Sequence, residues 1–277
     1  MTKSDKVRAI MTTAPSIDDY TPFSISPNPN TLHITPGLKA VLAKVRFTVN
    51  KRQGLCALLG DVGLGKSTLL RYLFGEYAAN ENCLTTLVPT PKFPSPFAFL
   101  KYMATDLGVD GKRSLTQQRD ELERWLIDRY EAGKNVVIFV DEAQVLDNAQ
   151  LELVRGLLNF ETHTHKLVQI VLAGQLELRE KLQSEKNRAL YSRISTYSVL
   201  DPLTLEETGG MLAHRCKHES INNPFTTEAV EKLYVVTKGI PRSVLKVAAL
   251  AYEMMLMEGA QTIDPELVSD TVPEVAV

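Results

Sequence analysis

The stretch Gly60-Asp61-Val62-Gly63-Leu64-Gly65-Lys66-Ser67 decides the fold of this chain. The apolar run Leu55–Leu59 before it has the length of a buried strand, and Thr68–Phe74 after it has the pattern of a helix. A strand, a glycine-rich loop ending in Lys-Ser and a helix together make a phosphate-binding P-loop. Glycines let backbone N–H groups turn toward phosphate oxygens, and the start of the following helix adds partial positive charge.

The P-loop pattern assigns a role to each of its polar residues. Lys66 is expected to reach the β- and γ-phosphates of a nucleotide, and Ser67 is expected to hold Mg²⁺. The alternative is a chance glycine-rich turn, which the flanking strand and helix argue against. The residues predicted to bind the nucleotide at this loop are Gly60, Asp61, Val62, Gly63, Leu64, Gly65, Lys66, Ser67 and Thr68.

A second informative stretch is the apolar run Val136–Val140, which ends in Asp141 and Glu142. Consecutive apolar residues of this length predict a strand that is buried on both faces. Ligands bind at the carboxyl ends of strands in open α/β sheets, so both carboxylates are expected near the phosphates. Asp141 suits the Walker B role of holding Mg²⁺, and Glu142 can polarise the attacking water. An acidic strand end or helix cap is the weaker alternative.

The rest of the first 201 residues alternates between strands and helices. Further strands are expected over Leu84–Val88, Leu167–Gln175 and Tyr197–Leu200. The alternation predicts a five-stranded parallel sheet between helices. The amide of Gln175, at a strand end, can orient water or sense the γ-phosphate, although a simple strand-end turn would look the same. Charged residues over Leu176–Leu190 predict one amphipathic helix.

From Pro202 the sheet pattern stops and only helices are expected. They are predicted over Leu205–His218, Thr227–Thr237, Arg242–Met257 and Asp264–Val268, with caps at Thr204 and at Thr226 or Thr227. We therefore expect a flexible tail over residues 1–20, a P-loop ATPase α/β domain over 21–201 and a helical lid over 202–277. The proline-rich segment from Thr21 to Pro36 is expected to lie extended on a domain, with Phe23, Ile25, Leu32 and Ile34 buried.

Composition excludes several classes of protein. The 277 residues carry a formal charge of −2, so nucleic-acid contact would need a local basic patch. No apolar run has the length of a membrane span, and no signal sequence is visible, so a cytoplasmic location without membrane contact is expected. Three scattered cysteines do not make a disulfide framework, and Cys56 reads as a small core residue. His214, Cys216 and His218 fit a surface helix better than a metal site.

These features, taken together, resemble the AAA+ ATPases. Several further stretches look like signatures of the ExeA/GspA family, which is similar to the transposition ATPases of the TniB, TnsC and MuB kind. They are Pro22–Pro29, Asp141-Glu142-Ala143-Gln144, Leu158-Asn159-Phe160-Glu161-Thr162, Gln169–Gln175 and Gly239-Ile240-Pro241-Arg242.

The resemblance implies Mg²⁺-dependent hydrolysis of ATP and roles for four more residues. Gln175 falls at the sensor 1 position, and Arg242 falls at sensor 2, contacting phosphate from the lid. Arg193 falls where the arginine finger is presented to a neighbouring subunit's nucleotide, and Arg188 is a second candidate for that role. A guanidinium suits the role because it is always charged and matches phosphate oxygens. The alternative for either arginine is an ordinary surface charge.

Two main functions follow from the resemblance. Secretion members of the family carry a membrane segment and often a peptidoglycan-binding part, and this sequence shows neither. We therefore expect a transposition regulator that assembles with ATP, as a hexameric ring or helical filament, on duplex DNA and recruits a transposase. Its DNA contacts would not read sequence. The basic residues between the second and third strands that could face the DNA are Lys92, Lys101, Lys112 and Arg113.

The alternative function is an ATPase that drives assembly of a protein partner, as in secretion. A third and weaker possibility is an NTP-dependent switch in signalling or phage defence. The sequence does not identify the partner or the number of subunits.

Overall fold

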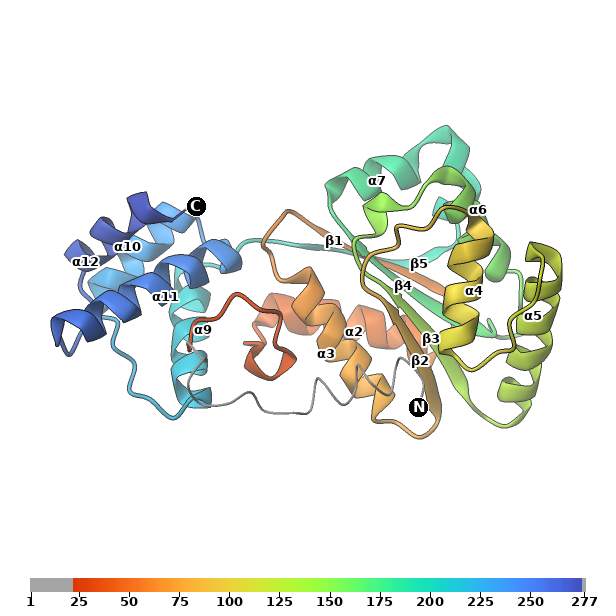
Figure 1. Cartoon of the computed structure of the whole chain (residues 1–277), viewed down its shortest axis with the longest axis horizontal. Coiled ribbons are helices and arrows are strands. Elements are labelled where there is room, and N and C mark those ends of the chain that lie inside the picture. Colours follow the sequence, from red (N-terminus) through yellow and green to blue (C-terminus); the bar gives the residue numbers. More distant parts are fainter. Residues whose placement is uncertain (1–21, 276–277) are drawn as a thin grey trace. The chain divides into compact units, whose positions relative to one another are not determined.

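The computed structural model describes residues 22–275 (Figure 1), so the tail predicted over residues 1–20 lies outside the described residues. The described chain forms two compact units. The sheet unit comprises Gly37–Asp61 and Leu70–Leu200, and the helical unit comprises residues 22–36, Val62–Leu69 and residues 201–275. The domain boundaries predicted from the sequence stay a prediction.

The sheet unit is built on one parallel sheet, as predicted. Its strand order is β2-β3-β4-β1-β5, and every neighbouring pair is parallel. The register pairs Leu55 with Ile170 and with Ile194, so β1 lies between β4 and β5. The strands are β1 (Leu55–Gly60), β2 (Cys83–Val88), β3 (Asn135–Val140), β4 (Val168–Gly174) and β5 (Ile194–Leu200).

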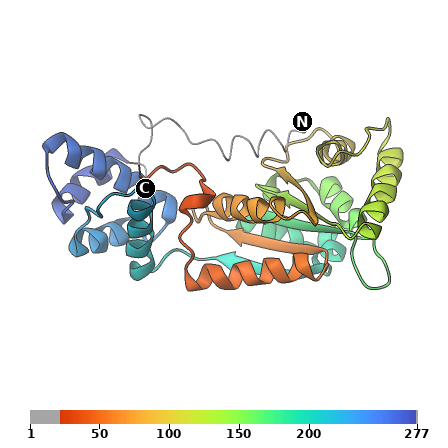
Figure 2. The same cartoon turned by 90° about the horizontal axis from the view of Figure 1, so that it is seen from below.

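Burial follows the position of each strand in the sheet. Every residue of β1, β3 and β4 is buried, which requires cover on both faces of the sheet. The edge strands β2 and β5 have partly exposed positions. Figure 2 shows the sheet between helices on both sides. The apolar runs identified in the sequence are therefore the centre of the sheet.

Three helices of the sheet unit, α4, α5 and α6, begin at a side-chain cap. The side chain of Ser114 accepts a hydrogen bond from the Gln117 N–H, and Asp147 and Gln150 form a capping box. The helices are α2 (Pro36–Asn50), α3 (Lys66–Ala78), α4 (Pro96–Asp106), α5 (Leu115–Glu131), α6 (Asn148–Leu157), α7 (Leu176–Gln183) and α8 (Arg188–Tyr191), with short 3₁₀ turns η3 (Ala143–Val145) and η4 (Glu185–Asn187). The first turn of α3 belongs to the helical unit.

The single helix predicted over Leu176–Leu190 is wrong. The chain breaks at Ser184, whose backbone is extended with φ −60° and ψ 152°. The Ser184 hydroxyl and the Asn187 amide both donate to the Lys181 carbonyl, at 2.7 and 2.9 Å, and so replace helical hydrogen bonds. As a result Arg188 begins α8 and Arg193 follows its end, so the two arginines do not share the end of one long helix.

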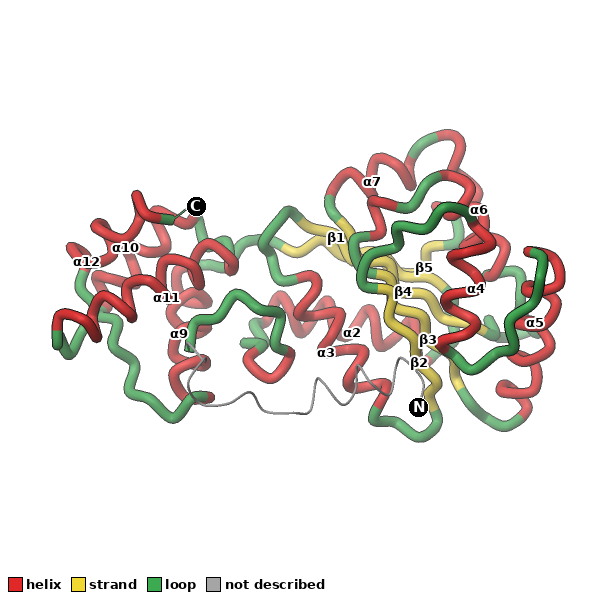
Figure 3. The backbone as a smooth tube through the Cα atoms, viewed as in Figure 1, coloured by secondary structure: helices red, strands yellow, loops and turns green. Residues whose placement is uncertain are grey.

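The helical unit contains four helices from Leu205 onward, all at or near their predicted positions (Figure 3). Thr204 forms a capping box with Glu207, and Thr226, rather than Thr227, caps α10. The helices are α9 (Leu205–His218), α10 (Thr227–Thr237), α11 (Pro241–Glu258) and α12 (Pro265–Thr271), followed by the 3₁₀ turn η5 (Val272–Glu274). Their core is apolar and includes Leu212, Leu233, Val244 and Val268.

The segment over residues 22–36 packs within the helical unit and contains one short 3₁₀ turn, η2 (Pro29–Thr31). Phe23 is fully buried, with its ring 5.4 Å from that of Phe225, and Arg215 donates to the Ser24 carbonyl at 2.8 Å. The expectation that Ile25 is buried is wrong, because it is 52% exposed. The chain turns directly after Ser24, whose hydroxyl accepts from the Ser26 N–H, and this turn carries Ile25 outward.

Among residues 22–275 no helix combines the length and the apolar character needed to cross a bilayer.

The three cysteines are buried and unpaired. Burial raises the pKa of the Cys56 thiol to about 12, so that thiol stays protonated at neutral pH. Cys56 is thus a core residue, as predicted.

Candidate nucleotide site

Three predicted site segments begin at one edge of the sheet. β1 ends at Gly60 and continues into the P-loop, β3 ends at Val140 directly before Asp141, and β4 ends at Gly174 directly before Gln175. Because these strands are parallel and β4 lies between the other two, their carboxyl ends share one edge. This is the edge at which open α/β sheets bind ligands.

The P-loop has the backbone geometry that its glycines predict. Gly63 and Gly65 have φ values of +83° and +86°, which residues with a Cβ adopt only under strain. Lys66, at the start of α3, is buried with 6% exposure, while Asp61 and Val62 are exposed and Ser67 and Thr68 are half-buried in the first helical turn. A lysine buried at the N-terminus of a helix suits the binding of a phosphate chain.

Within the helical unit the P-loop contacts the start of α11. The Arg242 N–H donates to the Gly63 carbonyl at 3.1 Å. A Cβ at Gly63 would lie 2.9 Å from Ile240 Cγ2 and 3.1 Å from Arg242 Cβ. The absence of a side chain at position 63 therefore allows this close approach. The structure brings Arg242, the predicted sensor 2, to the P-loop.

We expect Gly63→Ala to weaken nucleotide binding at least about tenfold. A left-handed residue with a Cβ costs roughly 1–2 kcal/mol, and here the added methyl must also displace α11. Gly108→Ala is the matched control, because Gly108 has φ +85° and no atom within 4 Å of an added Cβ. Calorimetry with ADP and thermal melting would measure both. Equal ADP affinity in the two variants would contradict the contact between α11 and the P-loop.

The acidic end of β3 is a hydrogen-bonded cluster. Asp141 is 7% exposed, and its Oδ1 accepts from the Glu142 N–H at 2.9 Å. Glu142 has the left-handed φ of +50°. Its Oε2 receives the Gln144 amide at 2.5 Å, and the Gln175 Nε2 lies 3.5 Å from the same oxygen. The structure thus brings Glu142 and Gln175 together. No role was predicted for Gln144 from the sequence. Its position two residues after Glu142 was the signal that could have suggested one.

Ser67 and Asp141 would be the residues to hold Mg²⁺. Mg²⁺ prefers oxygen ligands and is usually bound through one or two carboxylates together with phosphates. Asp141 offers a carboxylate of the kind that Mg²⁺ prefers, directly after β3. In the described range no group of three His, Cys, Asp and Glu side chains could hold a metal. His218 pairs with Glu219 at 2.7 Å, and the ring of His214 lies 5.6 Å from that of His33.

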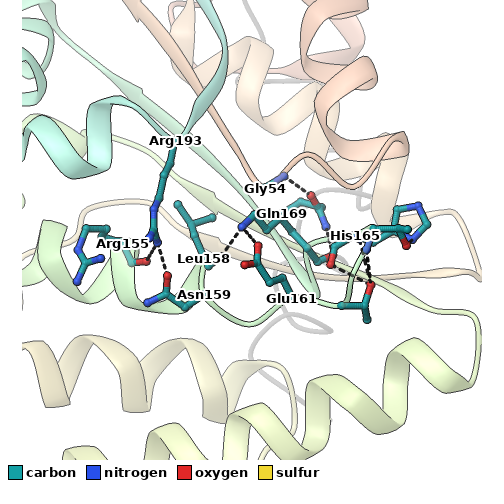
Figure 4. Close-up of polar contacts among 11 residues, drawn as sticks. Gly54, Arg155, Leu158, Asn159, Glu161, His165, Gln169 and Arg193 are labelled. Carbon is teal, nitrogen blue, oxygen red and sulfur yellow. Dashed lines mark hydrogen bonds and ion pairs between the residues drawn. The ribbon is translucent and has the colours of Figure 1, made fainter.

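Arg193 lies at the opposite edge of the sheet, where β5 begins. Its guanidinium donates to the Arg155 carbonyl at 2.9 Å and to Asn159 Oδ1, both at the end of α6 (Figure 4). Arg188, the other candidate, is exposed at the start of α8. The structure therefore does not place Arg193 with the residues that follow β3 and β4.

Arg193 contacts Asn159, which belongs to one of the stretches that resemble an ExeA/GspA signature. Leu158, Asn159 and Glu161 connect α6 to β4, and Lys166 donates to the Leu158 carbonyl at 2.9 Å and to the Glu161 carboxylate. Figure 4 shows this segment between Arg193 on one side and the β4 residue Gln169 on the other. Its polar residues fix the path of the chain into β4.

A hollow of about 410 Å³ lies beside this segment, in the sheet unit. Arg119, whose guanidinium stacks 5.4 Å from the Phe160 ring, is part of its wall. No pattern in the sequence predicts this hollow. The residues that line it are Pro96, Leu115, Thr116, Arg119, Asp120, Glu123, Ala149, Glu152, Leu153, Arg155, Gly156 and Asn159.

The predicted DNA-binding residues lie in and around α4 and the loop that follows it. Lys92, Lys101 and Arg113 are exposed. Lys101 also lies close to the loop, since a Cβ at Gly111 would be 3.3 Å from its Cε. Lys112 Nζ lies 3.3 Å from a Glu121 carboxylate oxygen, which reduces the charge it offers to a ligand.

Comparison with known proteins agrees with the fold described above. Residues 49–182 match the family model described as AAA domain. General secretion pathway protein A of Aeromonas hydrophila is 33% identical over 222 residues, which cover 80% of this chain and 40% of that protein. The chain therefore spans less than half the length of this relative.

Two solved structures show the same fold at low sequence identity. Cdc6p from Pyrobaculum aerophilum matches with a TM-score of 0.68 and 16% identity, over 92% of this chain and 70% of that chain. The Aeropyrum pernix ORC1 protein in complex with DNA matches with a TM-score of 0.66 and 17% identity, over 92% and 69%. The chain therefore has the P-loop AAA fold, matches the AAA domain model over residues 49–182 and is similar to General secretion pathway protein A.

Proposed function

We propose that this protein is a Mg²⁺-dependent ATPase that converts ATP and water to ADP and phosphate. The observation that carries the proposal is the arrangement at the carboxyl edge of the sheet. A P-loop with a buried lysine begins at this edge. The Glu142 carboxylate follows a strand that ends there, and the side-chain amides of Gln144 and Gln175 orient it. Phosphoryl transfer needs positioning and charge stabilisation more than covalent chemistry, and these residues supply both.

Each residue has one role in the proposed reaction. Lys66 and the P-loop N–H groups bind the β- and γ-phosphates, while Ser67 and Asp141 hold the magnesium ion. Glu142 orients the attacking water and takes its proton as the water oxygen bonds to the γ-phosphorus and the bond from that phosphorus to the ADP oxygen breaks. Gln175 contacts the γ-phosphate, and Arg242 contacts phosphate from α11. Bound Mg²⁺ neutralises charge on the phosphate oxygens.

The position of Arg193 supports a nucleotide shared between copies of the chain. Arg193 precedes Ile194, which pairs with Leu55 at the start of β1. The P-loop begins at the far end of that strand, roughly 17 Å away at ~3.3 Å per residue. That exceeds the reach of an arginine side chain, so a phosphate bound by Arg193 belongs to a second copy. We therefore propose that ATP drives assembly into a ring or a helical filament.

Two partners are candidates for this assembly. The relative named General secretion pathway protein A favours a protein partner, such as a secretion complex. The exposed basic residues around α4 favour duplex DNA, with the protein acting as a regulator of transposition that recruits a transposase. The Aeropyrum pernix ORC1 protein, which has the same fold, was solved in complex with DNA, and this supports the choice of DNA as a candidate partner.

Sedimentation and electron microscopy of the wild-type protein would test the proposal and separate the partners. We expect assemblies with ATP or a slowly hydrolysed analogue, and smaller species with ADP. Addition of duplex DNA at low salt should promote assembly if DNA is the partner. Protein that stays monomeric with ATP and DNA would contradict the DNA-bound assembly and leave the protein partner as the remaining candidate.

Lys112→Ala combined with Arg113→Ala is expected to weaken DNA binding to the same degree for all sequences. Each lost phosphate contact should reduce the slope of log affinity against log salt by about one. Fluorescence anisotropy with labelled duplexes at several salt concentrations would measure this. Lys217→Ala with Lys232→Ala removes two exposed charges from the helical unit and is the matched control. Equal slopes in both double variants would rule out the proposed contact.

A further inference from the structure

The side chain of Gln144 links the ends of two neighbouring strands. Its Nε2 donates to Glu142 Oε2 at 2.5 Å, and its Oε1 accepts from the Gln175 N–H at 3.1 Å. Glu142 follows β3 and Gln175 follows β4. One amide therefore connects the proposed general base to the backbone of the proposed γ-phosphate sensor. We propose that Gln144 is the positioning residue for hydrolysis, which aims the Glu142 carboxylate and couples it to Gln175.

The hydrogen bonds leave the Oε1 atom of the Glu142 carboxylate available for water. Gln144 and Gln175 both approach Oε2, and neither bond involves Oε1. A carboxylate held through one oxygen cannot rotate freely about its terminal bond, so the other oxygen has a defined direction. A general base is effective only when it lies within hydrogen-bond reach of the proton that it takes.

Glu142 needs such a restraint, because its backbone is strained. A non-glycine residue at φ +50° is strained and persists only where the surroundings hold it. The Asp141 carboxylate holds the Glu142 N–H, and Gln144 holds its side chain. The strain and the two bonds together place the carboxylate at the sheet edge instead of in the following turn η3.

Gln144 is itself fixed by its neighbours. Lys181, on α7, donates to the Gln144 carbonyl at 2.6 Å and to the Leu146 carbonyl at 2.8 Å. Gly174 leaves room for the Gln144 amide, because a Cβ at that position would lie 3.0 Å from Gln144 Oε1 and 2.7 Å from Leu178 Cδ2. Gln144 is therefore held at its backbone carbonyl, at Nε2 and at Oε1, which makes it a rigid link.

This inference rests on the proposed ATPase function and predicts a change in turnover without a change in binding. Gln144→Ala is expected to lower kcat about tenfold to a hundredfold, the range for losing a hydrogen bond to a charged group. KM for ATP and the affinity for ADP should change less than about twofold, since Gln144 bonds Glu142, Gln175 and Lys181 within the sheet unit. Steady-state kinetics, calorimetry and thermal melting would measure these quantities.

Gln144→Glu separates the two halves of the link. Its carboxylate can still accept from the Gln175 N–H, but it cannot donate to Glu142, so kcat should be as low as in Gln144→Ala or lower. Gln144→Asn keeps the amide but is shorter, and should recover only part of the rate. Gln183→Ala is the matched control, because it removes an exposed glutamine of α7 whose amide donates to the Tyr191 hydroxyl at 3.2 Å, away from Glu142 and Gln175.

Three results would overturn the inference. They are a wild-type kcat in Gln144→Ala, full activity in Gln144→Glu, and a loss of ADP affinity equal to the loss of rate. Glu142→Gln distinguishes this failure from failure of the proposed function. If Glu142→Gln blocks hydrolysis while Gln144→Ala is normal, only the role of Gln144 is wrong. If Glu142→Gln is itself fully active, the assignment of the general base is wrong.

Discussion

Glu142→Gln is expected to lower ATP hydrolysis by a factor of roughly 10² to 10⁴, the usual contribution of a general base, while leaving ATP binding intact. The amide has nearly the same size and can lie in the same place, but it cannot take a proton from water. The variant should therefore remain in its ATP-bound state and stay assembled. Single-turnover hydrolysis and sedimentation with ATP would show both effects.

Two controls make the result specific. Lys66→Ala should abolish nucleotide binding, because it removes the buried ammonium from the P-loop. Glu177→Gln changes an exposed carboxylate in the first turn of α7 and should behave as wild type. Hydrolysis at the wild-type rate in Glu142→Gln would remove the role assigned to this residue.

Arg193→Ala is expected to reduce hydrolysis about a thousandfold or more under conditions in which the wild type assembles, as for other arginine fingers. Nucleotide affinity of the monomer should not change. Loss of the bonds to Arg155 and Asn159 should also lower stability by about 1 kcal/mol, so thermal melting must accompany the kinetics. Arg188→Ala tests the second candidate.

Mixing two inactive variants tests whether Arg193 acts on a second copy. In a mixture of Arg193→Ala and Lys66→Ala, some interfaces combine ATP bound to the first variant with an intact arginine from the second. Hydrolysis should therefore recover in part when the variants are mixed. An inactive Arg193→Ala protein that shows no recovery would instead indicate an effect within one copy.

The sheet was predictable because its central strands are continuous apolar runs. Strands such as β3 need no long-range information, since only a strand covered on both faces tolerates five consecutive buried apolar residues. The caps Ser114 and Thr204 were predictable for a similar reason, because the capping bond is local. The site segments also followed from the strands, since chain order places Asp141 and Gln175 directly after β3 and β4.

The failures arose where side chains compete with the backbone or act at a distance. The break at Ser184 depends on side-chain bonds to one carbonyl, which the charge pattern of the helix hides. Ile25 was wrongly predicted to be buried, because the sequence does not reveal the turn at Ser24. The bond of Arg193 to Arg155 joins residues 38 positions apart, and no local signal reveals it.

The hydrogen bond from the Arg242 N–H to the Gly63 carbonyl uses only main-chain atoms. Every amino acid at position 242 except proline can therefore donate it, whatever its side chain does. The attachment of α11 to the P-loop and the charge presented to phosphate are thus separable traits, although one residue carries both. A descendant of this protein could lose its phosphate-sensing arginine and still keep the same main-chain connection.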